Sequence, residues 1–124
     1  MTVVTDPAVV AARAADSKKA EEILVLDVGE VLGIVGTFVI AGASNARLVR
    51  AIVEEIEDRL REDLGRKPRS VEGLSDASWV LLDYGDLVVH VFLAETREFY
   101  GLERLWSDVP RLEWEGVTAS GRES

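Results

Sequence analysis

The chain has 124 residues, of which 48% are hydrophobic and 30% are charged, and its formal net charge at pH 7 is −9. This length and composition indicate one globular domain with a single hydrophobic core. The acidic balance argues against nucleic acid as the direct ligand, because phosphate binding requires clustered lysine and arginine, and it favours a basic partner instead. The chain has no cysteine, which excludes disulfides, thiolate nucleophiles and sulfur-ligated metals.

The sequence shows no pattern typical of export or of membrane insertion. The first ten residues, MTVVTDPAVV, lack the basic and apolar blocks of a signal peptide. The longest uncharged run, 31–46, is too short for a membrane span and is interrupted by glycines. We therefore expect a cytoplasmic protein that makes no membrane contact.

The first third of the chain predicts one helix and two strands. Asp6 is a suitable N-cap and Pro7 a suitable first helical residue, so we expect a helix over 7–21. The apolar runs 23–28 and 37–41 predict short strands that are buried on both faces.

The clearest helix follows the turn GASN at 42–45. Its apolar stripe consists of Leu48, Val49, Ile52, Val53, Ile56, Leu60 and Leu64. Ser44 or Asn45 is the expected N-cap, and Gly65 marks the end. A glycine turn between a strand and a helix can also cradle phosphate. The spacing of known phosphate-binding loops is absent, which favours simple capping.

Two apolar runs on either side of Gly85 and Asp86 predict a β-hairpin with a two-residue loop. Gly85 suits the positive φ of a type II′ turn, and the loop length fixes the register. One face then pairs Leu82 with Val89 and Val80 with Val91. The mixed second face pairs Asp83 with Val88, Leu81 with His90, and Trp79 with Phe92. We expect the first face in the core and a function on the second.

The remaining segments are shorter. Residues 71–73 predict a short strand, and Thr96 is the expected N-cap of a helix that continues through Trp106. The small polar residues of 116–124 predict a flexible tail, so the domain is expected to span 1–115.

An enzyme built on this sequence would have to use Asp27, Asp83, Asp86 and His90, or the GASN turn. A carboxylate can orient a histidine for base catalysis, and we expect His90 to be partly buried and bonded to Asp83. However, no nucleophile motif accompanies them, and one histidine with scattered aspartates is not a convincing metal set. We therefore expect no catalytic activity, no metal and no cofactor.

Residues 79–106 carry an ordered series of aromatic, acidic and glycine positions. The series is Trp79, Asp83, Gly85, Asp86, Val89, His90 and Phe92, then Arg97, Tyr100, Leu102, Glu103, Leu105 and Trp106. It resembles the signature of the ribosomal silencing factor family, also called the Iojap-like family. A second signature of that family is similar to GASNARLVRAI at 42–52. The resemblance covers about residues 6–113.

The resemblance implies a fold and a function. The fold is a single-domain α/β structure, a mixed sheet with flanking helices on a nucleotidyltransferase-like scaffold. The function is that of a translational repressor, which binds protein fourteen of the large ribosomal subunit and sterically blocks subunit association, mainly in starvation. A homodimer is plausible for the family. The expected partner-binding residues are Trp79, Leu81, Asp83, Asp86, His90, Arg97, Tyr100, Leu102, Glu103, Leu105 and Trp106.

Residues 83–115 also have a composition typical of a protein–protein interface, which supports this expectation. They contain the large aromatic anchors Tyr84, Tyr100, Trp106 and Trp114, and eight acidic residues against three arginines. Two alternatives stay open. One is a nucleotide-binding or nucleotidyltransferase enzyme that uses Ser44, Asp83 and Asp86. The other is a general ribosome-assembly factor that uses the same acidic surface.

Overall fold

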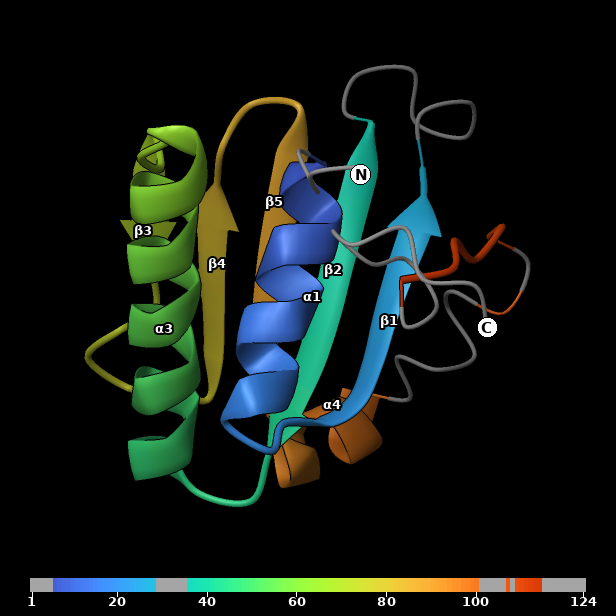
Figure 1. The fold of residues 1–124 in the computed structure, drawn as a ribbon. Coiled ribbons are helices and arrows are strands. Elements are labelled where there is room, and N and C mark those ends of the chain that lie inside the picture. Colours follow the sequence, from blue (N-terminus) through green and yellow to red (C-terminus); the bar gives the residue numbers. More distant parts are fainter. Residues whose placement is uncertain (1–5, 29–35, 101–106, 108, 115–124) are drawn as a thin grey trace.

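The protein folds around a five-stranded mixed β-sheet (Figure 1). The structure is a computed structural model that describes residues 6–28, 36–100, 107 and 109–114, with residues 99 and 100 in backbone only. The strands are β1 (Glu21–Asp27), β2 (Thr37–Ala43), β3 (Ser70–Glu72), β4 (Trp79–Asp83) and β5 (Leu87–Leu93). The helices are α1 (Pro7–Ser17), α3 (Ala46–Leu64) and α4 (Ala94–Tyr100).

The strand order is β1-β2-β5-β4-β3. β2 and β5 pair in parallel at the centre, and the other neighbouring pairs are antiparallel. This arrangement confirms the predicted α/β class with a mixed sheet and flanking helices. Within the described ranges, none of the helices is long and apolar enough to cross a bilayer.

Helix α1 begins as predicted but ends earlier. The Asp6 carboxylate accepts a hydrogen bond from the Ala8 N–H at 3.0 Å, and Pro7 opens the first turn. The helix ends at Ser17 rather than at residue 21, because Lys19 adopts a φ of +65° and β1 begins at Glu21. A lysine gives no sequence signal of a left-handed helix end, which is usually glycine.

Helix α3 matches its prediction at both ends. Asn45 is the N-cap, and its side chain accepts a hydrogen bond from the Leu48 N–H at 2.8 Å. Gly65 closes the helix with a φ of +66°. The glycine turn therefore serves to cap the helix, as its spacing predicted.

The two faces of the sheet differ, because the two long helices pack against only one of them. Helices α1 and α3 lie side by side on one of them, which we call the near face (Figure 1). Its side chains are almost completely buried and form the main core: Val25, Val39, Ala41, Val80, Leu82, Val89 and Val91. We call the opposite face of the sheet the far face.

The β4–β5 hairpin has the predicted register in every pair. Leu82 lies opposite Val89 and Leu81 opposite His90, so the apolar face is the near face and the mixed face is the far face. Gly85 has a φ of +95°, as the two-residue loop requires, and the Tyr84 N–H donates to the Leu87 carbonyl at 2.8 Å.

Helix α4 begins at Ala94, directly after β5, so the prediction of Thr96 as its N-cap is wrong. The chain passes from β5 to α4 without a loop, and no capping residue in the sequence indicates this helix start. The described part of this helix ends at Tyr100, and the predicted continuation to Trp106 lies outside the described residues.

Tyr84 belongs to the main core and is not the exposed anchor that its residue type suggested. Its side chain is 5% exposed, and among the described residues its hydroxyl has no hydrogen-bond partner. Burial raises the pKa of Tyr84 to about 12.

We expect Tyr84→Phe to leave the free energy of unfolding unchanged or to raise it by up to about 1 kcal/mol, because it removes a buried unsatisfied hydroxyl. Tyr84→Ala should cost about 3–5 kcal/mol through the cavity it leaves. Urea unfolding of both variants checks this, and a loss of more than 1 kcal/mol in Tyr84→Phe would contradict it.

Candidate partner-binding face

The far face collects the residues that the hairpin pattern singled out. Strand register places side chains from four neighbouring strands on it. They are Leu24 and Leu26 of β1, Phe38 and Ile40 of β2, Val88, His90 and Phe92 of β5, and Trp79, Leu81 and Asp83 of β4. The short edge strand β3 adds Ser70 and Glu72 beside β4.

Four rings form a cluster at the middle of this face. The ring centroids of Phe38 and His90 lie 4.7 Å apart, as do those of Trp79 and Phe92. The His90 and Phe92 rings are nearly parallel, at 5° and 6.0 Å. Phe92 is fully buried, Phe38 is half-buried, and Trp79 is 38% exposed. Phe92 also belongs to a second, smaller core on the far face, with Leu26, Val28 and Ile40, so the cluster joins this core to the surface.

Trp79 and His90 are joined by a hydrogen bond. The indole Nε1–H of Trp79 donates to Nδ1 of His90 at 3.2 Å. Because Nδ1 accepts, the neutral imidazole carries its proton on Nε2. Burial lowers the pKa of His90 to about 4, so the ring is neutral at pH 7.

Asp83 does not bond to His90, which corrects the sequence-based expectation. Its carboxylate instead accepts a hydrogen bond from the Gly85 N–H at 2.8 Å. An aspartate commonly binds the backbone two residues further on at a turn. The Asp83 side chain thus supports the hairpin loop and does not orient a catalytic histidine.

Asp86 is the other acidic residue of the loop, and it is exposed. Arg66 donates from Nη2 to Oδ1 of Asp86 at 2.6 Å, and this hydrogen bond holds the pKa of Asp86 below its ordinary value. The same Nη2 also donates to the Tyr84 carbonyl at 3.1 Å. Part of the negative charge at this end of the hairpin is therefore already paired.

Arg97 of α4 is 5% exposed, although the sequence placed it among the partner contacts. Its Nη1 lies 3.3 Å from the position that a Cβ on Gly42 would occupy, and its Nη2 lies 3.8 Å from a carboxylate oxygen of Glu22. Gly42 thus leaves the space in which this guanidinium packs across the end of β2. Sequence alone could not place these three residues together.

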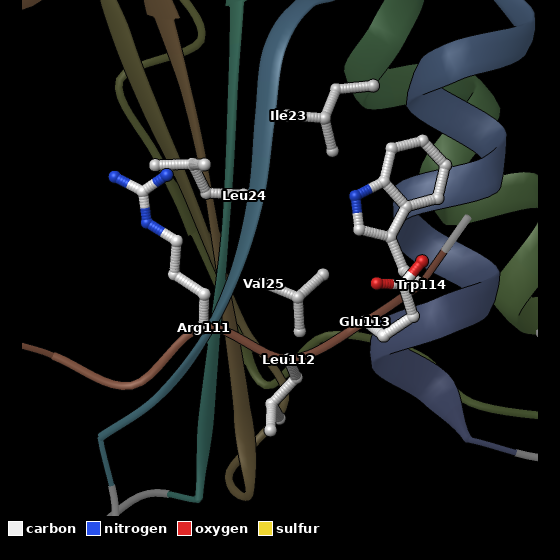
Figure 2. A pocket seen from close by; sticks show the side chains of 7 residues that line it. All are labelled: Ile23, Leu24, Val25, Arg111, Leu112, Glu113 and Trp114. Carbon is white, nitrogen blue, oxygen red and sulfur yellow. The ribbon is translucent and has the colours of Figure 1, made fainter. Parts of the chain in front are cut away.

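A hollow of about 290 Å³ lies at the outer edge of β1 (Figure 2). Residues 111–114 run beside β1 there, with an antiparallel bridge between Leu26 and Arg111. In Figure 2 Trp114 points toward Ile23 beside α1, and it packs against the main core. Trp114 is therefore a half-buried packing residue at the near side of this edge.

A nucleotidyltransferase built on this sequence would use Ser44 together with Asp83 and Asp86. Ser44 and Asp86 lie at opposite ends of the sheet. Ser44 follows Ala43 at one end of β2, whereas Asp86 precedes Leu87, whose partner is Thr37 at the other end. The seven residues of β2 separate these ends by about 20 Å, at roughly 3.3 Å per residue. In the described ranges, no group of three His, Cys, Asp or Glu side chains could hold a metal ion.

The predicted site is thus placed in part. Trp79, Leu81, Asp83 and His90 share the far face, while Asp86 lies in the adjoining loop. The side chain of Tyr100 and the whole of Leu102, Glu103, Leu105 and Trp106 lie outside the described residues. Phe38 and Phe92 complete the ring cluster and were missed as site residues, although the second lay on the predicted mixed face.

The fold and this face define a small mixed α/β domain with a partly exposed aromatic surface on the side of the sheet away from its long helices. The chain belongs to the RsfS family, described as ribosomal silencing factor during starvation, whose model matches residues 4–124. Family membership confirms the resemblance noted in the sequence.

The relatives support the same assignment. The ribosomal silencing factor RsfS of Bacillus subtilis is 43% identical over 101 residues, which cover 82% of this chain and 85% of that protein. A more distant relative from Mus musculus, named mitochondrial assembly of ribosomal large subunit protein 1, is 30% identical over 92 residues, 73% of this chain and 40% of that protein. The crystal structure of protein CV0518 from Chromobacterium violaceum superposes with a TM-score of 0.76 at 29% identity and covers 93% of each chain.

Proposed function

We propose that this protein is a translational repressor that binds the large ribosomal subunit through its protein fourteen and sterically blocks association with the small subunit, mainly in starvation. Membership of the ribosomal silencing factor family supports this proposal. In such a mechanism the protein makes and breaks no covalent bond. Selectivity lies in a protein–protein surface, and we expect the function in the cytoplasm.

The observation that carries the proposal is the partly exposed Trp79 on the far face. Tryptophan is among the residue types that contribute most to binding at interfaces. The ring of Trp79 packs against the rings of Phe92 and His90, and the apolar side chains of Leu81 and Phe38 are half-buried on the same face. The acidic edge formed by Glu72 and Asp83 lies on the same face. An aromatic centre with an acidic border fits an apolar patch flanked by lysine or arginine on the partner.

The negative charge should act mainly on the rate of encounter. With a net charge of −9, the protein is attracted over a distance to a basic protein surface, and salt screens that attraction. The proposed surface also includes Asp86 and the segment from Tyr100 to Trp106, whereas Arg97 is buried. A homodimer is likewise a proposal.

Trp79→Ala should weaken binding to purified large subunits about 30-fold, since loss of a central aromatic contact costs roughly 2 kcal/mol. Leu112→Ala is the matched control, because Leu112 is 41% exposed and lies at the β1 edge, away from the ring cluster. It should change binding less than twofold. Co-sedimentation with large subunits measures both variants.

The same pair should separate in a subunit reassociation assay followed by light scattering. Wild-type protein and Leu112→Ala should prevent purified large and small subunits from joining, and Trp79→Ala should not at equal concentration. Undiminished inhibition by a folded Trp79→Ala would show that another surface carries the activity.

A second function is favoured by the name of the mouse relative, which refers to assembly of the large ribosomal subunit. A general assembly factor would use the acidic far-face edge on several basic ribosomal proteins. Pull-down against a panel of isolated ribosomal proteins separates the two functions: a silencing factor should retain protein fourteen alone, and an assembly factor should retain several. The enzyme alternative lacks comparable support, because Ser44 and Asp86 lie at opposite ends of the sheet.

A further inference from the structure

Burying a histidine among aromatic rings costs free energy, because the imidazole is polar and its charged form is poorly solvated there. His90 is 6% exposed and lies between Phe38, Phe92 and Trp79. Burial penalises its charged form strongly enough to lower its pKa to about 4. A phenylalanine at this position would fill the space without that penalty. Packing alone therefore does not explain why a histidine occupies this position.

The hydrogen bond from Trp79 supplies that reason. The indole N–H lies on β4 and its acceptor Nδ1 on β5, so the bond spans neighbouring strands and restrains rotation of the indole ring. Satisfaction of the N–H alone would not require a histidine, because water or another acceptor can also accept from an indole N–H. What the bond adds is one fixed orientation of the ring.

We infer that His90 is a positioning residue, which holds the Trp79 indole in its binding orientation and does not contact the partner directly. The inference rests on the proposed function, in which Trp79 is the central contact. A ring that is already ordered loses less rotational freedom when the partner binds. Removing the acceptor should therefore weaken binding to large subunits about 3- to 10-fold, less than removing the indole itself.

Asparagine and leucine form a matched pair for the test. The two side chains have nearly the same shape, so His90→Asn and His90→Leu leave similar space beside the rings. Only asparagine places an oxygen where Nδ1 lies, and it can accept the indole N–H. The full-length chain is used throughout, and each variant is also made in a Trp79→Phe background, which keeps a ring but lacks the N–H.

Two measurements decide the inference. The first is the indole N–H resonance of Trp79, assigned by its loss in Trp79→Phe, together with its exchange with solvent. The second is the Kd for purified large subunits. We expect His90→Asn to keep a protected indole proton and to bind about 3- to 10-fold more tightly than His90→Leu. In the Trp79→Phe background the two variants should bind equally.

The inference is overturned if His90→Asn and His90→Leu, both folded by circular dichroism, bind equally when Trp79 is present. It is also overturned if they differ as much without the indole N–H as with it. Failure of the proposed function has a different signature, since wild-type protein would then not bind large subunits at all. In that case an unprotected indole proton in the wild-type chain would overturn the positioning role by itself, and a protected one would support it.

Discussion

Gly73→Ala is expected to lower the free energy of unfolding by about 3 kcal/mol or more, the largest effect of any glycine substitution proposed for this chain. Gly73 has a φ of +89°, a conformation that costs an L-residue about 1–2 kcal/mol. An added Cβ would also lie 2.2 Å from the Trp79 carbonyl oxygen, which is backbone and cannot rotate away. The loop between β3 and β4 would have to shift.

Gly65→Ala provides the matched control. Gly65 has a φ of +66° at the end of α3, but no atom lies within 4 Å of the added Cβ. This variant should lose only the conformational part, about 1 kcal/mol. Urea unfolding of the two variants and of the wild type separates strain from collision. Equal losses would show that the loop accommodates the methyl group without cost.

The Gly73 substitution should reach the candidate site as well. The Ala77 N–H donates to the Gly73 carbonyl at 2.8 Å, and the Ser78 carbonyl accepts from the Leu93 N–H at 2.9 Å. The first bond closes the loop on itself, and the second ties Ser78, the residue before Trp79, to the last residue of β5. A change in the indole N–H resonance of Trp79 in a folded Gly73→Ala protein is therefore expected, and none is expected in Gly65→Ala.

Acidification from pH 6.5 to pH 4 should cost the fold about 3 kcal/mol through His90 alone. Burial lowers the pKa of His90 from 6.5 to about 4, so in this window the unfolded chain binds a proton that the folded chain does not. The free energy of unfolding therefore decreases as the pH falls. This contribution is complete above pH 6.5 and is fully lost below pH 4.

His90→Leu isolates this contribution from the carboxylates that titrate in the same range. Its stability should fall less than that of the wild type between pH 6.5 and pH 4, although the variant loses packing at every pH. Because His90 is the single histidine of the sequence, its titration can also be followed directly by NMR. A folded-state pKa near 6.5, or parallel stability curves for the two proteins, would contradict the prediction.

The hairpin was predictable because its information is local. Gly85 and Asp86 fix a two-residue loop, and alternation of apolar residues then allows a single register with Leu82 opposite Val89. The caps of α3 were equally local, since Asn45 and Gly65 are residue types with strong preferences for helix ends. These features determine most of the fold around the candidate site.

The features that were missed depend on the placement of individual side chains, both between distant parts of the chain and within the hairpin. Arg97 reads as a surface residue until Gly42 and Glu22 are placed beside it. The partner of His90 was predicted as Asp83, whose carboxylate is instead used by its own turn. The sequence could not identify Trp79 as the partner of His90. Trp79 and Asp83 both lie within reach of His90 on the same face, and only the geometry of the loop distinguishes them.

The parallel pairing of β2 with β5 constrains how the protein can fold during its own synthesis. Each paired residue of β2 precedes its partner by 50 positions, from Thr37 with Leu87 to Ala43 with Leu93. Closing so long a segment is slow, because its entropy is lost before the pairing is gained. The middle of the sheet therefore cannot be completed until Leu93 has left the exit tunnel. Until then β2 can pair with β1 but has no partner strand on its other side.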